Sequence, residues 1–97
     1  MAKTDYDIDS RLQIFVLLDS IEAAARKNDP SRARQAHEKM TLWMTTDHLS
    51  YDHPWKLLDI ALRQVFELAG GWVRGDGSVS AEMVEDAAKR AVSLLTK

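Results

Sequence analysis

The chain of 97 residues contains no cysteine, so no disulfide can stabilise it and no thiol can serve as a nucleophile or metal ligand. This absence favours a reducing, cytoplasmic location. The first nine residues, MAKTDYDID, include three aspartates and lack the apolar segment of a signal peptide, which favours the same location.

Proline and glycine are also scarce, with two and four residues, and aromatic residues make up 7% of the chain. No apolar run approaches the roughly 18 residues that a membrane-spanning helix needs, so we expect no membrane partner. Thirteen basic residues against 15 acidic ones give a net charge of −2, which provides no general attraction to nucleic acid. We therefore expect a chain that is stabilised by its apolar core alone.

Apolar residues recur at helical spacing, and no window shows the alternation of a β-strand. We predict four helices, over about residues 8–27, 30–46, 54–70 and 80–95. The short connection between the first two favours antiparallel neighbours. With residues 1–6 frayed, residues 1–97 are predicted to form a single all-α domain, a small antiparallel bundle of about four helices.

The third predicted helix has the strongest pattern, PWKLLDIALRQVFELA. Its apolar arc covers about half of the circumference, so we expect it to contact at least two neighbours. The arc contains Leu57, Leu58, Ala61, Leu62, Val65, Leu68 and Ala69. Gly70 and Gly71 suit the end of the helix. Trp72 is still in phase with the arc, however, so an extension towards Gly75 is the alternative.

Short-range signals place three of the helix ends. Asn28 tolerates the left-handed conformation that ends a helix, and Asp29 and Pro30 suit the cap and first position of the next one. Ser80 is expected to cap the last helix.

The first predicted helix carries apolar residues on two faces. One stripe is assigned to the core: Ile14, Leu17, Leu18, Ile21, Ala24 and Ala25. A second patch occupies only the N-terminal half: Ile8, Leu12, Phe15 and Val16. Either this half lies deeper in the bundle, or the patch contacts a second copy or another partner.

The second and fourth helices have one apolar stripe each, and both are assigned to the core. The stripe of the second contains Ala33, Ala36, Met40, Trp43 and Met44. The stripe of the fourth contains Met83, Val84, Ala87, Ala88, Ala91, Val92, Leu94 and Leu95. Leu42 and Ile60 point away from the stripes of their helices, and we expect them to be exposed.

Apolar residues outside the core stripes, or at their edges, are the candidates for contact with a partner. The candidate interface contains Ile8, Leu12, Phe15, Leu42, Trp55 and Phe66. Buried aromatic residues often dominate such interfaces. We predict a non-enzymatic protein–protein interaction module, acting as a homodimer or by docking on a larger protein. Its size and style are typical of an inhibitor or accessory factor from a phage or other mobile element.

A second hypothesis is a nucleic-acid-binding accessory protein that uses basic residues around the first helical hairpin. These residues are Arg26, Lys27, Arg32, Arg34 and Lys39. Cations in this arrangement can contact a phosphate backbone. Asp29 and Glu38 lie among them, so a solvated charged face is the simpler interpretation.

Two Asp-His pairs, Asp47-His48 and Asp52-His53, contain residue types that bind zinc or iron. Their spacing matches no helical metal motif. His37 and His48 would share a helix face, but eleven residues of helix separate them by about 16 Å. A metal-dependent function of His48 and His53 is the third hypothesis. We assign no catalytic, cofactor-binding or metal-binding residues, and we expect no enzyme.

Overall fold

The computed structural model describes residues 8–44 and 56–95, except for the side chains of residues 42–44. These residues form helices and no strand. The helices are α1 (Ile8–Arg26), α2 (Pro30–Met44), α3 (Lys56–Val73) and α4 (Ala81–Leu95). The predicted all-α fold is therefore confirmed.

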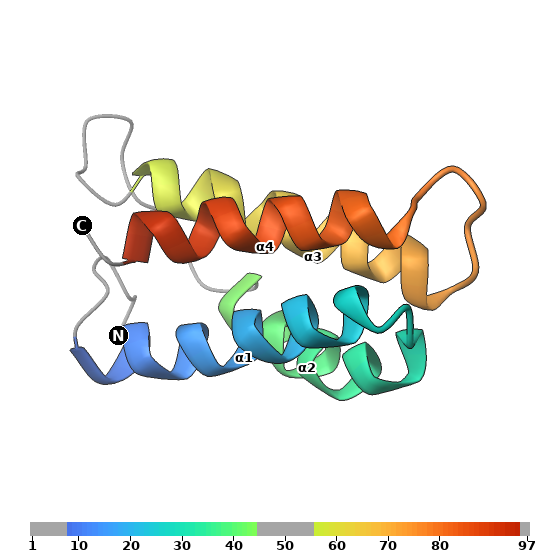
Figure 1. Cartoon of the computed structure of the whole chain (residues 1–97). Helices are drawn as coiled ribbons and strands as arrows, with labels where there is room; N and C mark the ends of the chain where they lie inside the picture. The colour runs from blue at the N-terminus through green and yellow to red at the C-terminus, as the bar shows by residue number, and fades with distance from the viewer. Residues whose placement is uncertain (1–7, 45–55, 96–97) are drawn as a thin grey trace.

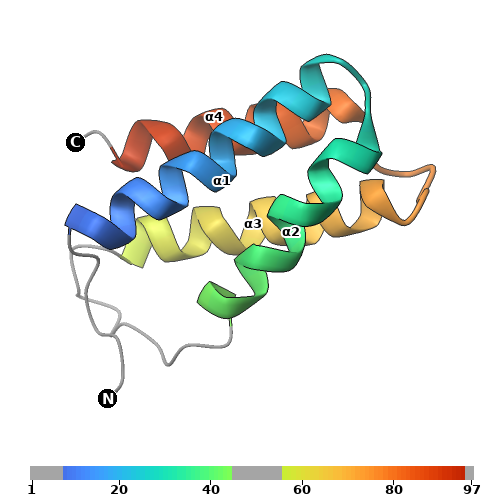
Figure 2. The ribbon, with the colours of Figure 1, turned by 90° about the horizontal axis from the view of Figure 1, so that it is seen from below.

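The helices lie in two layers, with α1 and α2 below α3 and α4 in Figure 1. Each helix runs opposite to the one before it, and both α1 and α3 pack against α2 and α4. Figure 2 shows that α2 crosses α3 obliquely. None of the described helices combines the length and the apolar content that crossing a bilayer requires.

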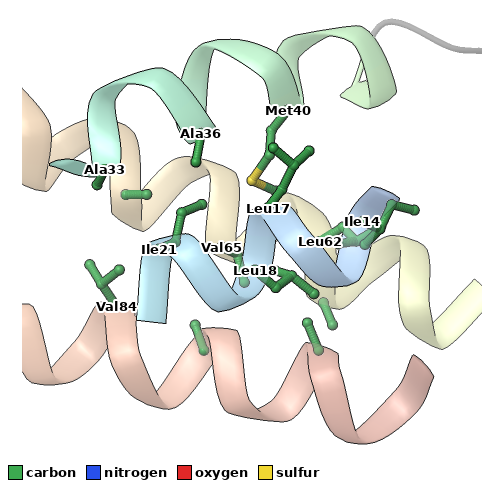
Figure 3. Packing of buried hydrophobic residues seen from close by; sticks show 14 of the residues in the cluster. Ile14, Leu17, Leu18, Ile21, Ala33, Ala36, Met40, Leu62, Val65 and Val84 are labelled. Carbon is green, nitrogen blue, oxygen red and sulfur yellow. The ribbon is translucent and has the colours of Figure 1, made fainter. Parts of the chain in front are cut away.

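The core lies between the two layers, and Figure 3 shows side chains from all four helices directed into it. The stripe predicted for α1 is buried along its whole length. Leu58, Leu62 and Val65 of α3 are at most 1% exposed, as the wide apolar arc required. Alanines occupy much of the buried face of α4, and such small side chains let neighbouring helices approach closely: Ala87, Ala88 and Ala91.

The turn between α1 and α2 forms as its residues predict. Asn28 has a φ of 53°, and its N–H donates to the carbonyl of Ala25 at 3.0 Å. The N–H of Asp29 donates to the carbonyl of Ala24 at 2.9 Å, which completes the C-terminal motif of α1. The Ser31 hydroxyl donates to the Asp29 carboxylate at 2.7 Å and lowers the pKa of that carboxyl.

The end of α3 differs from the main prediction. The helix passes through Gly70 and Gly71 and ends at Val73, so the expected stop at these glycines is wrong. The residue in the left-handed region is Gly75, with a φ of 84°, and its N–H donates to the carbonyl of Trp72 at 3.0 Å. The structure therefore agrees better with the alternative, in which the helix extends towards Gly75.

Gly70 and Gly71 provide space. A Cβ atom on Gly70 would lie 2.8 Å from Nε2 of His37 on α2, and one on Gly71 would lie 3.1 Å from Cγ2 of Val79. Both distances are shorter than ordinary van der Waals contacts. The two glycines thus let α2 and the α3–α4 connection lie against the last turns of α3.

The start of α4 is capped as predicted. The Ser80 side-chain oxygen accepts a hydrogen bond from the N–H of Met83 at 3.2 Å. Before the cap, the N–H and hydroxyl of Ser78 both donate to the Asp76 carboxylate, at 2.9 and 2.7 Å. These two hydrogen bonds lower the pKa of the Asp76 carboxyl.

Two residues assigned to the core are in fact exposed: Leu57 by 66% and Met83 by 43%. Each lies near the start of its helix and at the edge of the apolar stripe, which the neighbouring helices leave uncovered. Ile60 is exposed, as expected. The side chains of Leu42, Trp43 and Met44, and the predicted helix ends at residues 45–46 and 54–55, lie outside the described residues.

Candidate interaction surface

The N-terminal half of α1 presents large apolar side chains to solvent. These residues, here called the outer patch, are Ile8 (67% exposed), Leu12 (58%), Phe15 (41%) and Val16 (60%). The interpretation that this half of α1 lies deeper in the bundle is therefore wrong for the isolated chain. The patch that the sequence placed on a second face of the helix is exposed.

The geometry of α1 explains why its neighbours leave the outer patch uncovered. Leu12 and Ile21 are nine residues apart, which at about 100° per residue places them on opposite sides of the helix. Ile21 is fully buried between α2 and α4, the two helices that pack against α1. Because both neighbours approach from the side of Ile21, neither reaches Leu12.

Two exposed carboxylates border the outer patch, Asp9 at its start and Asp19 one turn beyond it. Ser20, the next residue, donates its hydroxyl proton to the Val16 carbonyl at 2.9 Å, so this hydroxyl is satisfied within the helix. Arg11, the one basic residue of α1 beside the patch, is half-buried, so the exposed charges of this rim are acidic.

The C-terminal half of α1 carries ion pairs where the N-terminal half carries the outer patch. Arg26 pairs with Glu22 one turn before it, and with Glu85 of α4 at 3.5 Å. Lys89 also contacts Glu85, at 3.2 Å. The hydrogen bond from Lys89 lowers the pKa of the Glu85 carboxyl, and the nearby Arg26 guanidinium lowers it further.

An open depression of about 640 Å³ lies between α1 and α2, next to the outer patch. Its lining comprises Asp19, Ser20, Ala23, Ala24, Ser31, Arg32, Arg34 and Gln35. Asp19 belongs both to the rim of the patch and to this depression. This lining is mostly polar and includes two arginines, so the depression is distinct from the apolar surface of the outer patch.

The outer patch contains three of the six predicted interface residues, Ile8, Leu12 and Phe15, beside Val16, which shares their predicted face. Phe66 lies apart from these residues, half-buried in the contact between α3 and α2. The Leu42 side chain and Trp55 lie outside the described residues. A contact of any of these residues with a partner stays a prediction.

Sequence reasoning missed the role of His37, which it considered only in relation to a metal site. The His37 ring stacks on Phe66 with centroids 4.5 Å apart and planes inclined by 14°. Its Nε2 lies 3.2 Å from the Phe66 carbonyl oxygen, and the ring occupies the space over Gly70. The signal was the glycine pair, which was interpreted as a helix stop rather than as a site of close approach.

Ion pairs occupy part of the predicted basic cluster. Arg26 is engaged by two glutamates, and Arg32 lies 3.9 Å from Asp29. Lys27, Arg34 and Lys39 are exposed. Since carboxylates already contact two of the five cations, the cluster is less available to phosphate groups than the sequence suggested. Nucleic-acid binding stays a prediction.

Among the described residues, no three His, Asp or Glu side chains are grouped so that they could hold a metal ion. His48 and His53, on which the metal hypothesis depends, lie outside those residues. That hypothesis stays untested.

Comparisons with protein-family models, curated proteins and solved structures found no match for this chain. The function must therefore be inferred from the surface that the fold exposes.

Proposed function

We propose that this chain is a non-enzymatic protein-interaction module and that its binding surface is the outer patch. One observation carries the proposal: four large apolar side chains on three turns of α1 are between 41% and 67% exposed. Contiguous exposed apolar residues with a polar rim are typical of protein-binding sites.

The fold does not need these side chains, because the opposite stripe of α1 already fills the core. Fully burying an exposed side chain of this size contributes about 1.5–3 kcal/mol. Each of these side chains is 41–67% exposed, so roughly half of that contribution is still to be gained, less the cost of association. Four neighbouring side chains therefore provide a useful driving force for a complex and little for the isolated bundle.

Within the outer patch, Leu12 lies opposite the core and Phe15 supplies the aromatic ring. An aromatic side chain among aliphatic ones is a common anchor at the centre of an interface. A chain that acts through such a surface suits the role of an inhibitor or accessory factor, and its lack of cysteine supports action in the cytoplasm.

Cross-linking in cells that make the protein tests this proposal, with a photoreactive amino acid placed at position 12 or at position 57. Leu57 is a matched control, since it is a leucine on α3 with 66% exposure against 58% for Leu12. We expect position 12 to give a protein adduct, absent from the Phe15→Asp variant, and position 57 to give none. Equal yields from the two positions would contradict the proposal.

A further inference from the structure

We propose that the outer patch binds an amphipathic helix of another protein, and that Lys or Arg residues flank the apolar stripe of that helix. This inference rests on the proposed function and specifies the chemistry of the partner. Charge, self-complementarity and shape each support it.

The acidic rim determines which charges the partner can bring near the patch. Between Ile8 and Ser20, α1 carries two exposed carboxylates, Asp9 and Asp19, and one half-buried guanidinium, Arg11. Asp9 and Asp19 are exposed at the two ends of the apolar side chains. A partner with basic residues beside its apolar stripe gains attraction at both ends, whereas an acidic partner is repelled.

A second copy of the chain offers this surface less charge complementarity than a basic partner does. If two α1 helices paired antiparallel around Leu12, Asp19 of one copy would lie about four residues, or about 6 Å along the axis, from Asp9 of the other. Symmetry would repeat this contact at the other end. A parallel pair would place each aspartate beside its own equivalent. In the antiparallel pair, however, Arg11 of each copy would lie equally near Asp9 of the other and offset this repulsion. A second copy therefore gains no net attraction between charges, unlike a partner with basic flanks.

The shape of the surface favours a helical partner. Ile8, Leu12, Phe15 and Val16 follow the i, i+4, i+7, i+8 spacing of helical anchors and extend over about 12 Å of axis. A partner helix can therefore lay its own apolar stripe along these four side chains.

Two designed peptides of roughly 18 residues, long enough to form helices, test the inference. Both carry the same leucine stripe, and the remaining positions are lysine in one and glutamate in the other. We expect the protein to bind the lysine peptide at least about tenfold more tightly, as measured by fluorescence anisotropy at physiological salt. Equal affinities, or a preference for the glutamate peptide, would overturn the inference.

Matched variants separate specific binding from general attraction to an acidic protein. Leu12→Asp and Leu57→Asp change the net charge equally, on α1 and α3 respectively. We expect Leu12→Asp to weaken binding of the lysine peptide about tenfold, although the variant is more acidic, and Leu57→Asp to bind like wild type. Binding that is insensitive to Leu12→Asp would show that charge alone drives it, which also overturns the inference.

A charge reversal completes the test. In the double variant Asp9→Lys/Asp19→Lys, the preference should change to the glutamate peptide, and an unchanged preference would contradict the role of the rim.

Other outcomes separate this inference from the proposed function. If both peptides bound equally and Leu12→Asp weakened the binding of both, the outer patch would remain an interaction surface, and only the basic character of the partner would be wrong. Self-association abolished by Leu12→Asp, measured by light scattering, would instead identify a second copy as the occupant. If neither peptide bound and cross-linking at position 12 also failed, the proposed function itself would fall.

Discussion

α1 and α3 both carry more apolar residues than one core contact needs, but the additional residues occupy different faces of the two helices. On α3 most of the additional residues widen the stripe, whose flanks face α2 and α4, although Leu57 at its edge is exposed. Phe66, at one such flank, is covered by the stacked ring of His37. On α1 the additional residues lie opposite the stripe, where no helix packs.

The comparison shows that the position of excess apolar surface matters more than its amount. A wide stripe can be covered by the two neighbours that a helix has in a four-helix bundle. A patch on the opposite side cannot, because those neighbours approach from the core. Such a patch on a folded helix therefore points to contacts outside the chain.

Substitutions on the buried face of α1 are expected to change the free energy of unfolding most. Leu18 is fully buried, so Leu18→Ala should lower the free energy of unfolding by about 3 kcal/mol through lost burial and a cavity. Leu12→Ala, six residues earlier on the same helix, should change it by less than about 0.5 kcal/mol. Urea denaturation measures both. Similar losses in the two variants would show that the outer patch also supports the fold.

A substitution at Gly70, where α2 packs on α3, is expected to change the free energy of unfolding less. Gly70→Ala places a Cβ atom 2.8 Å from His37 Nε2, and displacing this ring should cost about 1–3 kcal/mol. The gain of about 1 kcal/mol in helix propensity offsets this only in part. In a His37→Ala background the same change should become stabilising, because the obstructing ring is gone. The other close atom, Arg74 Nη1 at 3.2 Å from the added Cβ atom, ends a flexible side chain that can move. A double-mutant cycle by urea denaturation tests this, and additive effects would refute it.

The ion pairs on the C-terminal half of α1 give a weaker, pH-dependent effect. The pKa of Glu85 is lowered from 4.5, chiefly by its hydrogen bond with Lys89. A carboxyl with a lower pKa in the folded state stabilises the fold above its unfolded pKa, and this contribution disappears as the pH falls through the lowered value. The stability advantage of wild type over Glu85→Gln should thus shrink between about pH 5 and pH 3, in urea titrations. A constant difference would exclude this linkage.

The smallest effect on stability is expected at the centre of the outer patch. Leu12→Asp removes an exposed side chain, so the free energy of unfolding should stay within about 0.5 kcal/mol of wild type. Thermal and urea unfolding check this, with Leu57→Asp as the control. A large loss confined to Leu12→Asp would mean that the patch is covered within the isolated chain, contrary to the structure.

Much of the candidate site could be predicted from the sequence. The spacing of Ile8, Leu12 and Phe15 placed them on a second face of α1, although periodicity alone left open whether that face was covered. The close approach at Gly70 was missed, because glycine marks both helix ends and tight contacts. Leu57 was assigned to the buried arc, but it is exposed. Its angle on the helix shows which face it lies on, and does not show whether a neighbouring helix extends far enough to cover it.

Helical periodicity and capping residues by themselves determined the helices, the turn at Asn28 and the cap at Ser80, since these depend on interactions a few residues apart. Only the tertiary structure decided that two helices flank α1 on one side and leave Leu12 in solvent. It also decided that His37 rests on Phe66 over Gly70. The physical reason is that burial depends on which surfaces meet in space, and local sequence pattern records which faces are apolar but not what covers them.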